Sequence, residues 1–232
     1  MDTSTQSGFS LLETVLAIGI ILFGLISLIS LSTNSFVSGE ITSAEFAAAN
    51  FAREGIEVVR AHRDSNWLAY ASSPTTGPKW NEKLSRVDPT EPGGIDYTAI
   101  ISLDPTLPGY FDFSPDAIGD TCPGASASVY DCSRVWLHPT ASLYFQAGKD
   151  SYPTFNPSLY EEQSYSRIIS LYPICRNKSV ETDEQFIFTG TCLSTLGPLY
   201  EQVGIDVIST VEWTTRGQDA NYALEEYLYN WQ

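Results

Sequence analysis

The chain has 232 residues, with 12 Lys+Arg against 28 Asp+Glu and a formal net charge of −16. Such acidity excludes nucleic-acid binding through phosphate contacts, because those contacts rely on basic side chains. Hydrophobic residues make up 43% of the chain and charged residues 17%, which excludes a disordered acidic polypeptide and predicts a sizeable core.

The first predicted element is a helix in an almost uncharged segment. Residues 15–31 read VLAIGIILFGLISLISL, and between Thr3 and Gly39 the one charged residue is Glu13. About 20 apolar helical residues span the hydrocarbon core of a bilayer, so this segment predicts a membrane span. A carboxylate in such a span is costly, which marks Glu13 as a functional residue with a partner.

Two simpler interpretations of this segment are a cleaved secretory signal and a plain membrane anchor. A secretory signal carries a basic region before the apolar run and a small-residue cleavage site after it. Residues 1–8 contain no Lys or Arg, and no A-x-A site follows the apolar run. The segment therefore does not have the features of a secretory signal.

The residues ahead of the apolar run form a specific motif. Gly8-Phe9-Ser10-Leu11-Leu12-Glu13, followed by about 20 apolar residues, resembles the processing site of type IV prepilins and pseudopilins. The resemblance implies that residues 1–8 are a leader, that a prepilin peptidase cuts between Gly8 and Phe9, and that Phe9 is N-methylated. It also implies that Glu13 pairs with the mature N-terminus of a neighbouring subunit during assembly.

The helical pattern continues beyond the apolar run. Residues 41–67, ITSAEFAAANFAREGIEVVRAHRDSNW, lack proline, and the spacing of Ala47, Phe51, Val58 and His62 predicts an amphipathic helix face. We expect one helix over 9–65, with an apolar part at about 11–33 and an amphipathic part at about 40–65, and a possible bend at Gly39 or Gly55. Residues 52–67 also resemble the end of the first helix in PilV-type minor pilins.

The remaining residues, 66–232, are predicted to form a β-rich head with long Pro/Gly-rich loops. In the clearest strand, Ile205, Val207, Val211 and Trp213 alternate with polar residues expected on a wet face. Residues 222–231 fit a helix or a strand, and resemblance to PilV-type proteins favours the strand. The fold class is thus α+β and pilin-like, a long helix on an antiparallel sheet. The predicted strands are 97–103, 134–137, 142–145, 167–172, 185–188 and 205–214.

Four widely spaced cysteines predict two disulfides formed in an oxidising compartment. They are Cys122, Cys132, Cys175 and Cys192, which allow three connectivities. The pairing Cys122–Cys132 with Cys175–Cys192 is favoured because each bond closes a short loop, although the sequence leaves the alternatives open.

No catalytic or cofactor-binding motif is present in the sequence, so we expect a protein that is not an enzyme and holds no cofactor. Asp112, Asp116 and Asp120 lie in a Pro/Gly-rich stretch and are weak calcium candidates, without EF-hand spacing. Aromatic residues of the head, including Trp80, Trp136 and Tyr152, are candidates for an adhesive surface.

The sequence therefore predicts a structural minor pilin. Before assembly it would cross the inner membrane once, with the head outside the cytoplasm, and afterwards lie in a cell-surface or periplasmic filament. The implied partners are other pilin subunits, the prepilin peptidase, the assembly machinery and the lipid bilayer, with no direct nucleic-acid binding. The alternatives are a type II secretion pseudopilin and a membrane-anchored binding or adhesion domain that does not assemble.

Overall fold

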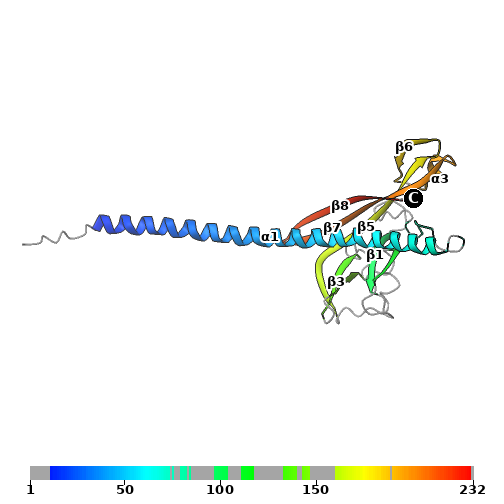
Figure 1. Cartoon of the computed structure of the whole chain (residues 1–232). Coiled ribbons are helices and arrows are strands. Elements are labelled where there is room, and N and C mark those ends of the chain that lie inside the picture. The colour runs from blue at the N-terminus through cyan, green and yellow to red at the C-terminus, as the bar shows by residue number, and fades with distance from the viewer. Residues whose placement is uncertain are drawn as a thin grey trace, which may run out of the picture. The chain divides into compact units, whose positions relative to one another are not determined.

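A computed structural model describes residues 11–73, 75, 79–82, 84, 97–103, 111–117, 133–139, 143–146, 160–188 and 190–230 (Figure 1). For 97–103, 111–117 and 143 it describes the backbone alone. The chain divides into two compact units, Met1–Glu45 and Phe46–Gln232. The helix α1, Leu11–Ser72, contributes to both units and ends beyond the predicted residue 65.

In the first unit α1 is stabilised by the helix propensity of its residues and by hydrogen bonds within the helix. Long unbranched and aliphatic residues favour the helix, and no proline interrupts it. Its hydroxyl groups turn back onto the helix, since Ser27 Oγ donates to the Phe23 carbonyl at 2.9 Å and Thr33 Oγ1 to the Ile29 carbonyl at 2.7 Å. These polar groups are therefore satisfied without water.

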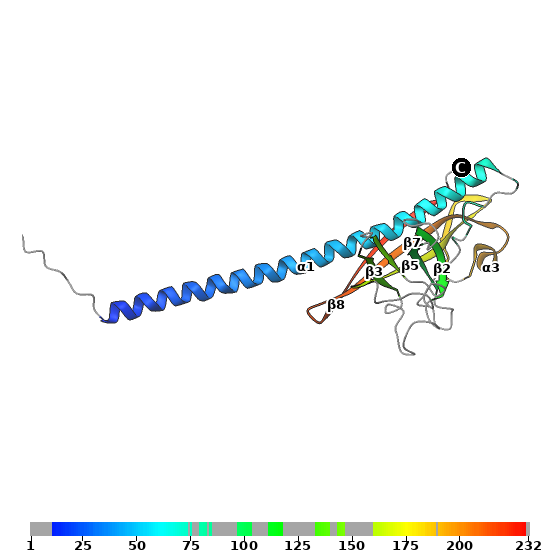
Figure 2. The same cartoon turned by 90° about the horizontal axis from the view of Figure 1, so that it is seen from below.

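The second unit contains a six-stranded antiparallel sheet in the order β4-β3-β5-β7-β8, with β6 also paired to β5. Figure 2 shows α3, Cys192–Leu196, at the end of the sheet opposite the turn between β7 and β8. A separate antiparallel pair is formed by β1, Tyr97–Leu103, and β2, Phe111–Ala117. The strands of the larger sheet are β3 Arg134–His138, β4 Leu143–Gln146, β5 Glu161–Asn177, β6 Val180–Phe186, β7 Tyr200–Thr215 and β8 Gln218–Tyr229.

The longest strand, β5, runs through Pro173, a residue that normally marks a strand edge. Pro173 stands opposite Ile205 of β7, while its carbonyl accepts a hydrogen bond from the Ile187 amide on the other side. The N and C=O of one strand residue point to the same side, so the missing N–H of Pro173 faces away from β7. The proline thus removes no bond of the β5–β7 ladder.

Residues 46–72 of α1 pack on one face of this sheet. The core there joins Ile56 and Val59 of the helix to Ile169 and Leu171 of β5 and to residues of β7 and β8. The predicted helix face was partly wrong, because Ala47, Val58 and His62 are only half-buried. The buried stripe of α1 consists of Ala48, Phe51, Ala52, Gly55, Ile56, Val59, Arg63 and Asn66.

Gly55 allows the helix to approach the sheet closely. A Cβ atom at this position would lie 2.6 Å from Ser209 Oγ and 3.2 Å from Ile169 Cδ1, whereas one at Gly39 would meet nothing within 4 Å. Gly55 is therefore a packing position, in contrast to the bend expected from the sequence.

The strand predictions are confirmed in location more than in extent. The first predicted strand, 97–103, coincides with β1, and the C-terminal segment is a strand that pairs with β7 along its length. The prediction at 167–172 was too short, and that at 185–188 lies near the end of β6. No strand was predicted at β2, where Asp112 and Asp116 were expected in a loop.

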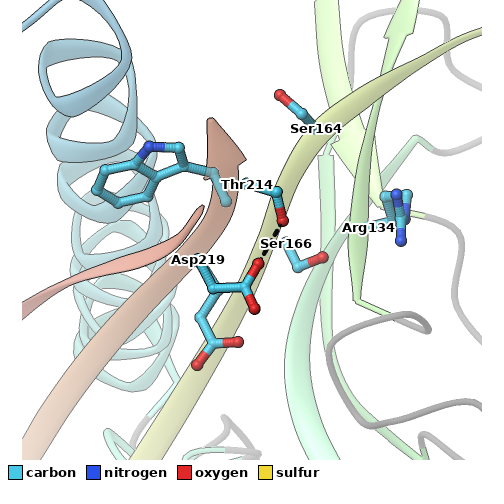
Figure 3. A pocket seen from close by; sticks show the side chains of 7 residues that line it. Arg134, Ser164, Ser166, Thr214 and Asp219 are labelled. Carbon is cyan, nitrogen blue, oxygen red and sulfur yellow. Dashed lines mark hydrogen bonds between the residues drawn. The ribbon is translucent and has the colours of Figure 1, made fainter. Parts of the chain in front are cut away.

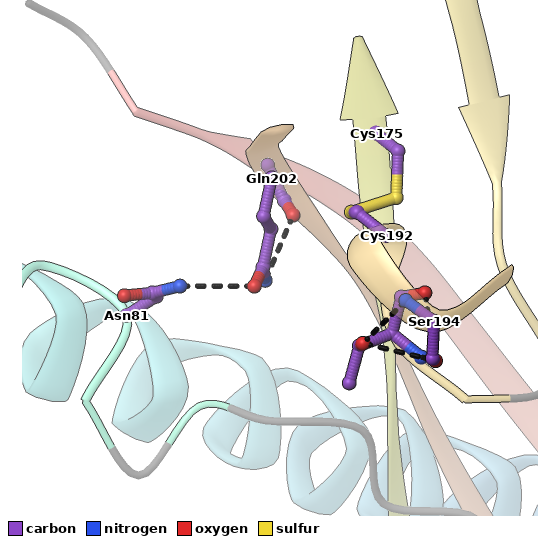
Figure 4. The surroundings of a disulfide bond; sticks show 7 residues. Asn81, Cys175, Cys192, Ser194 and Gln202 are labelled. Carbon is purple, nitrogen blue, oxygen red and sulfur yellow. Dashed lines mark hydrogen bonds between the residues drawn. A yellow bond between two sulfur atoms is a disulfide. The ribbon is translucent and has the colours of Figure 1, made fainter. Parts of the chain in front are cut away.

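A disulfide joins Cys175 of β5 to Cys192 of α3, with a Cα–Cα distance of 5.6 Å (Figure 4). Its sulfurs lie in a small apolar cluster with Ile187, Leu196 and Tyr200. The short helix α3 begins at a capping box in which Thr191 and Ser194 bond to each other's backbone N–H groups. This predicted pairing is confirmed, while Cys122 and Cys132 lie outside the described residues.

Candidate functional site

The most unusual surface of the first unit is its apolar helix. The helix is long and apolar enough to cross a membrane, and none of its most apolar window is buried. Exposed apolar side chains on this scale mark an interaction with lipid or with other apolar chains. About half or more of each residue is exposed for Leu11, Leu12, Val15, Leu16, Ile18, Ile20, Ile21, Leu22, Phe23, Leu25, Ile26, Leu28, Ile29, Leu31 and Phe36.

Glu13 lies in the first turn of α1 and is exposed. A carboxylate is favourable at this end of a helix, because the helix N-terminus carries a partial positive charge. The predicted processing residues Gly8 and Phe9 precede the described part of the chain. The exposed position of Glu13, beside apolar side chains, leaves its carboxylate accessible to a partner.

In the second unit, a buried arginine connects α1 to the sheet through hydrogen bonds. The sequence pattern did not identify this residue. The Arg167 side chain on β5 is fully buried. Its Nη1 donates to the Phe51 carbonyl at 3.2 Å and to Glu54 Oε2 at 2.9 Å, and its Nε donates to Gln146 Oε1 at 3.2 Å. Burial lowers the pKa of Arg167, and Glu54 partly offsets that effect.

Further along α1, contacts reach β8 and the residue after it. Arg60 pairs with Glu226, Arg63 donates to the Tyr229 carbonyl at 3.2 Å, and Trp67 Nε1 donates to Asn230 Oδ1 at 3.0 Å. Glu226 raises the pKa of Arg60 by accepting this bond. The amphipathic part of α1 is thus fixed to the C-terminal strand.

Asp206 corrects the expectation of a wet face on β7. It alternates with Ile205 and Val207, which face α1, so it lies on the opposite face of the sheet; yet it is only 3% exposed. Burial, and secondarily the charge of Glu225, raise the pKa of Asp206 to about 6. The signal available in the sequence was an aspartate flanked by β-branched residues, but the strand pattern assigned it to solvent.

A pocket of about 160 Å³ lies near the turn between β7 and β8 (Figure 3). Three of its residues form a cross-strand row, in which Arg134 stands opposite Ser166 and Ser166 opposite Glu212. Thr214 Oγ1 donates to Asp219 Oδ1 at 2.7 Å, and Arg134 pairs with Glu162 at 3.0 Å. The lining offers hydroxyl, carboxylate and guanidinium groups and includes no histidine or cysteine.

The remaining predicted site residues do not come together in the described structure. The side chains of Asp112 and Asp116, and the whole of Asp120, lie outside it, as does Tyr152. Among the residues that are described, no group of three His, Cys, Asp or Glu could hold a metal ion. Trp136 is buried, and Trp80 is half-buried and packs against the core.

Comparison with protein-family models, with curated proteins and with solved structures finds no match in any of the three.

Proposed function

We propose that the chain is a structural, non-enzymatic subunit of a type IV pilus or related filament, most like a minor pilin. The observation that carries the proposal is the exposed apolar part of α1, in which Glu13 is the one charged residue before Glu40, and which directly follows the Gly8-Phe9 motif. A helix of this kind inserts singly in a bilayer, and the same apolar surface can pack against other such helices once subunits leave the membrane.

Glu13 supplies the polar element of that packing. An unpaired carboxylate among apolar helices is expensive, and a nearby positive charge offsets the expense more strongly as the effective dielectric falls. In the proposed assembly the α-amino group of Phe9 from a neighbouring subunit provides this charge. The pair would contribute energy and also fix the axial position of one helix against the next.

Processing is tested by coexpressing the full chain with a prepilin peptidase and measuring the intact mass. We expect loss of residues 1–8 and a gain of one methyl group on Phe9. Gly8→Val is the matched control, because a β-branched side chain at the cut is expected to prevent processing. An uncut Met1 terminus, or cleavage after the apolar helix, would contradict the proposal and favour a plain anchored domain.

Assembly is tested separately with Glu13→Val, which keeps the helix apolar. We expect normal processing by intact mass but a loss of most incorporation into sheared filaments, because the carboxylate–amine pair is absent. Thr14→Val serves as the control, since the Thr14 hydroxyl donates only to the Leu11 carbonyl of its own helix. Normal incorporation of Glu13→Val would refute the role assigned to this residue.

The two tests do not separate a pilus subunit from a type II secretion pseudopilin, which shares the processing motif and the helix. That choice depends on the filament into which the processed chain is incorporated. Recovery with surface pili supports the minor pilin, whereas recovery only with a periplasmic secretion filament supports the pseudopilin.

A further inference from the structure

The carboxylate of Asp206 lies on the sheet face opposite α1, with one of its two oxygens buried and unpaired. Its Oδ1 atom is buried and accepts no hydrogen bond, and only 3% of the residue is exposed. A buried charged group normally pairs with an opposite charge or a set of hydrogen-bond donors. The unsatisfied oxygen is therefore a group that a ligand or partner can satisfy.

Aromatic residues surround this carboxylate. Tyr172 of β5 and Tyr227 of β8 stand directly opposite Asp206 on its two neighbouring strands. The ring of Phe188 lies 5.1 Å from that of Tyr172, and the ring of Phe186 lies 5.2 Å from that of Tyr227. Phe186, Phe188 and Tyr227 are 38%, 56% and 47% exposed, so they form an open aromatic rim.

The charged groups around Asp206 are mainly negative. Glu225 of β8 accepts a hydrogen bond from the Tyr227 hydroxyl at 2.6 Å, and this bond raises the pKa of Tyr227 to about 12. On the side of β6, Arg176 is held by Glu184 at 2.6 Å, and Glu184 also accepts from the Tyr229 hydroxyl. Arg176 is thus already paired, and among the described residues Asp206 and Glu225 contribute negative charge to this part of the sheet.

We propose that this Asp206 surface, made of Tyr172, Phe186, Phe188, Asp206, Glu225 and Tyr227, docks a partner protein through one arginine side chain. A guanidinium stacks on aromatic rings and donates two parallel hydrogen bonds to a carboxylate, so a single group satisfies both features of the surface. Because Asp206 Oδ1 is buried, the proposed docking requires the exposed Tyr227 ring to turn aside. The inference concerns the second unit alone and does not depend on the proposed filament role.

Charge also selects the kind of partner. A second copy of this chain would bring another formal charge of −16 to an already acidic surface. Like charges facing each other weaken an interface and favour other partners. The occupant is therefore a different protein with a basic, arginine-presenting surface.

The test uses the full chain in detergent micelles and N-acetyl-arginine amide as the probe. The control probe is N-acetyl-citrulline amide, which keeps the shape and removes the charge. The readout is the ¹³Cγ signal of Asp206, assigned by its loss in Asp206→Asn, titrated from pH 4 to pH 8. We expect saturating arginine probe to move the titration midpoint down by about one pH unit, which corresponds to about tenfold tighter binding to the ionised carboxylate.

Variants locate the binding. We expect Asp206→Asn and Tyr227→Ala each to weaken binding of the arginine probe about tenfold. Glu212→Gln, on the same strand and the same face but beside the separate pocket, is expected to bind normally. Absence of binding, equal binding of the citrulline probe, or an Asp206 midpoint that the arginine probe leaves unmoved would each overturn the proposal.

Discussion

The two parts of α1 differ in how their apolar residues are distributed around the helix. In residues 11–45 most apolar side chains are exposed and occur on all sides, whereas in residues 46–72 most form one stripe that is buried on the sheet, with Phe46 and Leu68 left exposed. A helix that is apolar all round belongs in an apolar medium, while an amphipathic one belongs at the surface of a folded core. Both parts are rich in apolar residues. The distribution of these residues around the helix therefore distinguishes the two parts.

The largest expected effect comes from removing the buried anchor of the second part. We expect Arg167→Ala to lower the free energy of unfolding by about 3–5 kcal/mol, because it leaves buried partners unsatisfied. The measurement is urea unfolding in micelles followed by tryptophan fluorescence, with far-UV circular dichroism recorded in parallel. Helical signal from residues 11–45 should outlast the loss of tertiary structure.

Arg134→Ala is the matched control, since Arg134 also reaches a glutamate from a strand but is partly exposed. An exposed pair contributes at most about 1 kcal/mol. Equal destabilisation by the two substitutions would show that burial does not distinguish these arginines.

The next largest effect concerns how the stability of the second unit depends on pH. The pKa of Asp206 is raised from 3.8 to about 6 in the folded state, so between these values the folded state binds more protons than the unfolded state. The stability that Asp206 contributes is therefore present below about pH 4 and is lost as pH rises through about 6. We expect this loss to reach up to about 3 kcal/mol.

Asp206→Asn removes the titrating group while keeping its size. The difference in unfolding free energy between Asp206→Asn and the parent chain should shift in favour of the variant by up to about 3 kcal/mol between pH 4 and pH 8. A difference that stays constant with pH would contradict the raised pKa.

Two glycines, one in each part of α1, test the difference between the exposed part and the packed part. We expect Gly55→Ala to destabilise the chain by about 1–2 kcal/mol, because the added Cβ meets Ser209 and outweighs the better helix propensity of alanine. Gly39→Ala, with open space around it, should instead stabilise the helix by about 0.5–1 kcal/mol. Thermal unfolding of both variants gives the comparison.

Ser209→Ala tests the cause, since it removes the atom nearest to the added methyl group. The double variant with Gly55→Ala should recover part of the lost stability. Equal effects of alanine at Gly39 and Gly55 would refute the close approach of helix and sheet.

The smallest expected effect concerns the Arg60–Glu226 pair, in which both side chains are about one third exposed. Because solvent screens such a pair, Glu226→Gln should lower the unfolding free energy by less than about 1 kcal/mol. Raising the salt concentration should reduce the difference further. A larger loss in urea unfolding would mean that the contact between α1 and β8 depends on this charge.

The sequence predicted elements whose patterns are strong and local. An unbroken apolar run gave the first part of α1, and alternation gave the central part of β7. The C-terminal strand was ambiguous by pattern because its apolar residues also fit helical spacing. Its pairing with β7 shows that it is a strand. The predicted strand 167–172 ends just before Pro173, whereas β5 continues to Asn177, because the side to which the proline nitrogen points depends on neighbours far away in the sequence.

The candidate residues divide in the same way. Glu13 could be singled out because a lone carboxylate in an apolar segment is visible in the sequence, whereas Arg167 and Asp206 could not. Each depends on what covers its own side of the sheet, where Gln146 and Glu54 surround Arg167 and aromatic residues stand opposite Asp206. Alternation along a strand assigns a residue to a face without showing whether that face is buried.

The attachment of α1 to the end of the chain has a consequence for biosynthesis. Arg60 and Arg63 contact residues 166 positions later, and Trp67 contacts one 163 positions later. The amphipathic part of α1 is therefore made long before these partners, and it contacts them only when β8 is complete. Closing such a long loop is entropically unfavourable and leaves an apolar stripe uncovered during synthesis. A chain shortened by even its last strand would lose Leu228 from the core and present that stripe to chaperones and proteases.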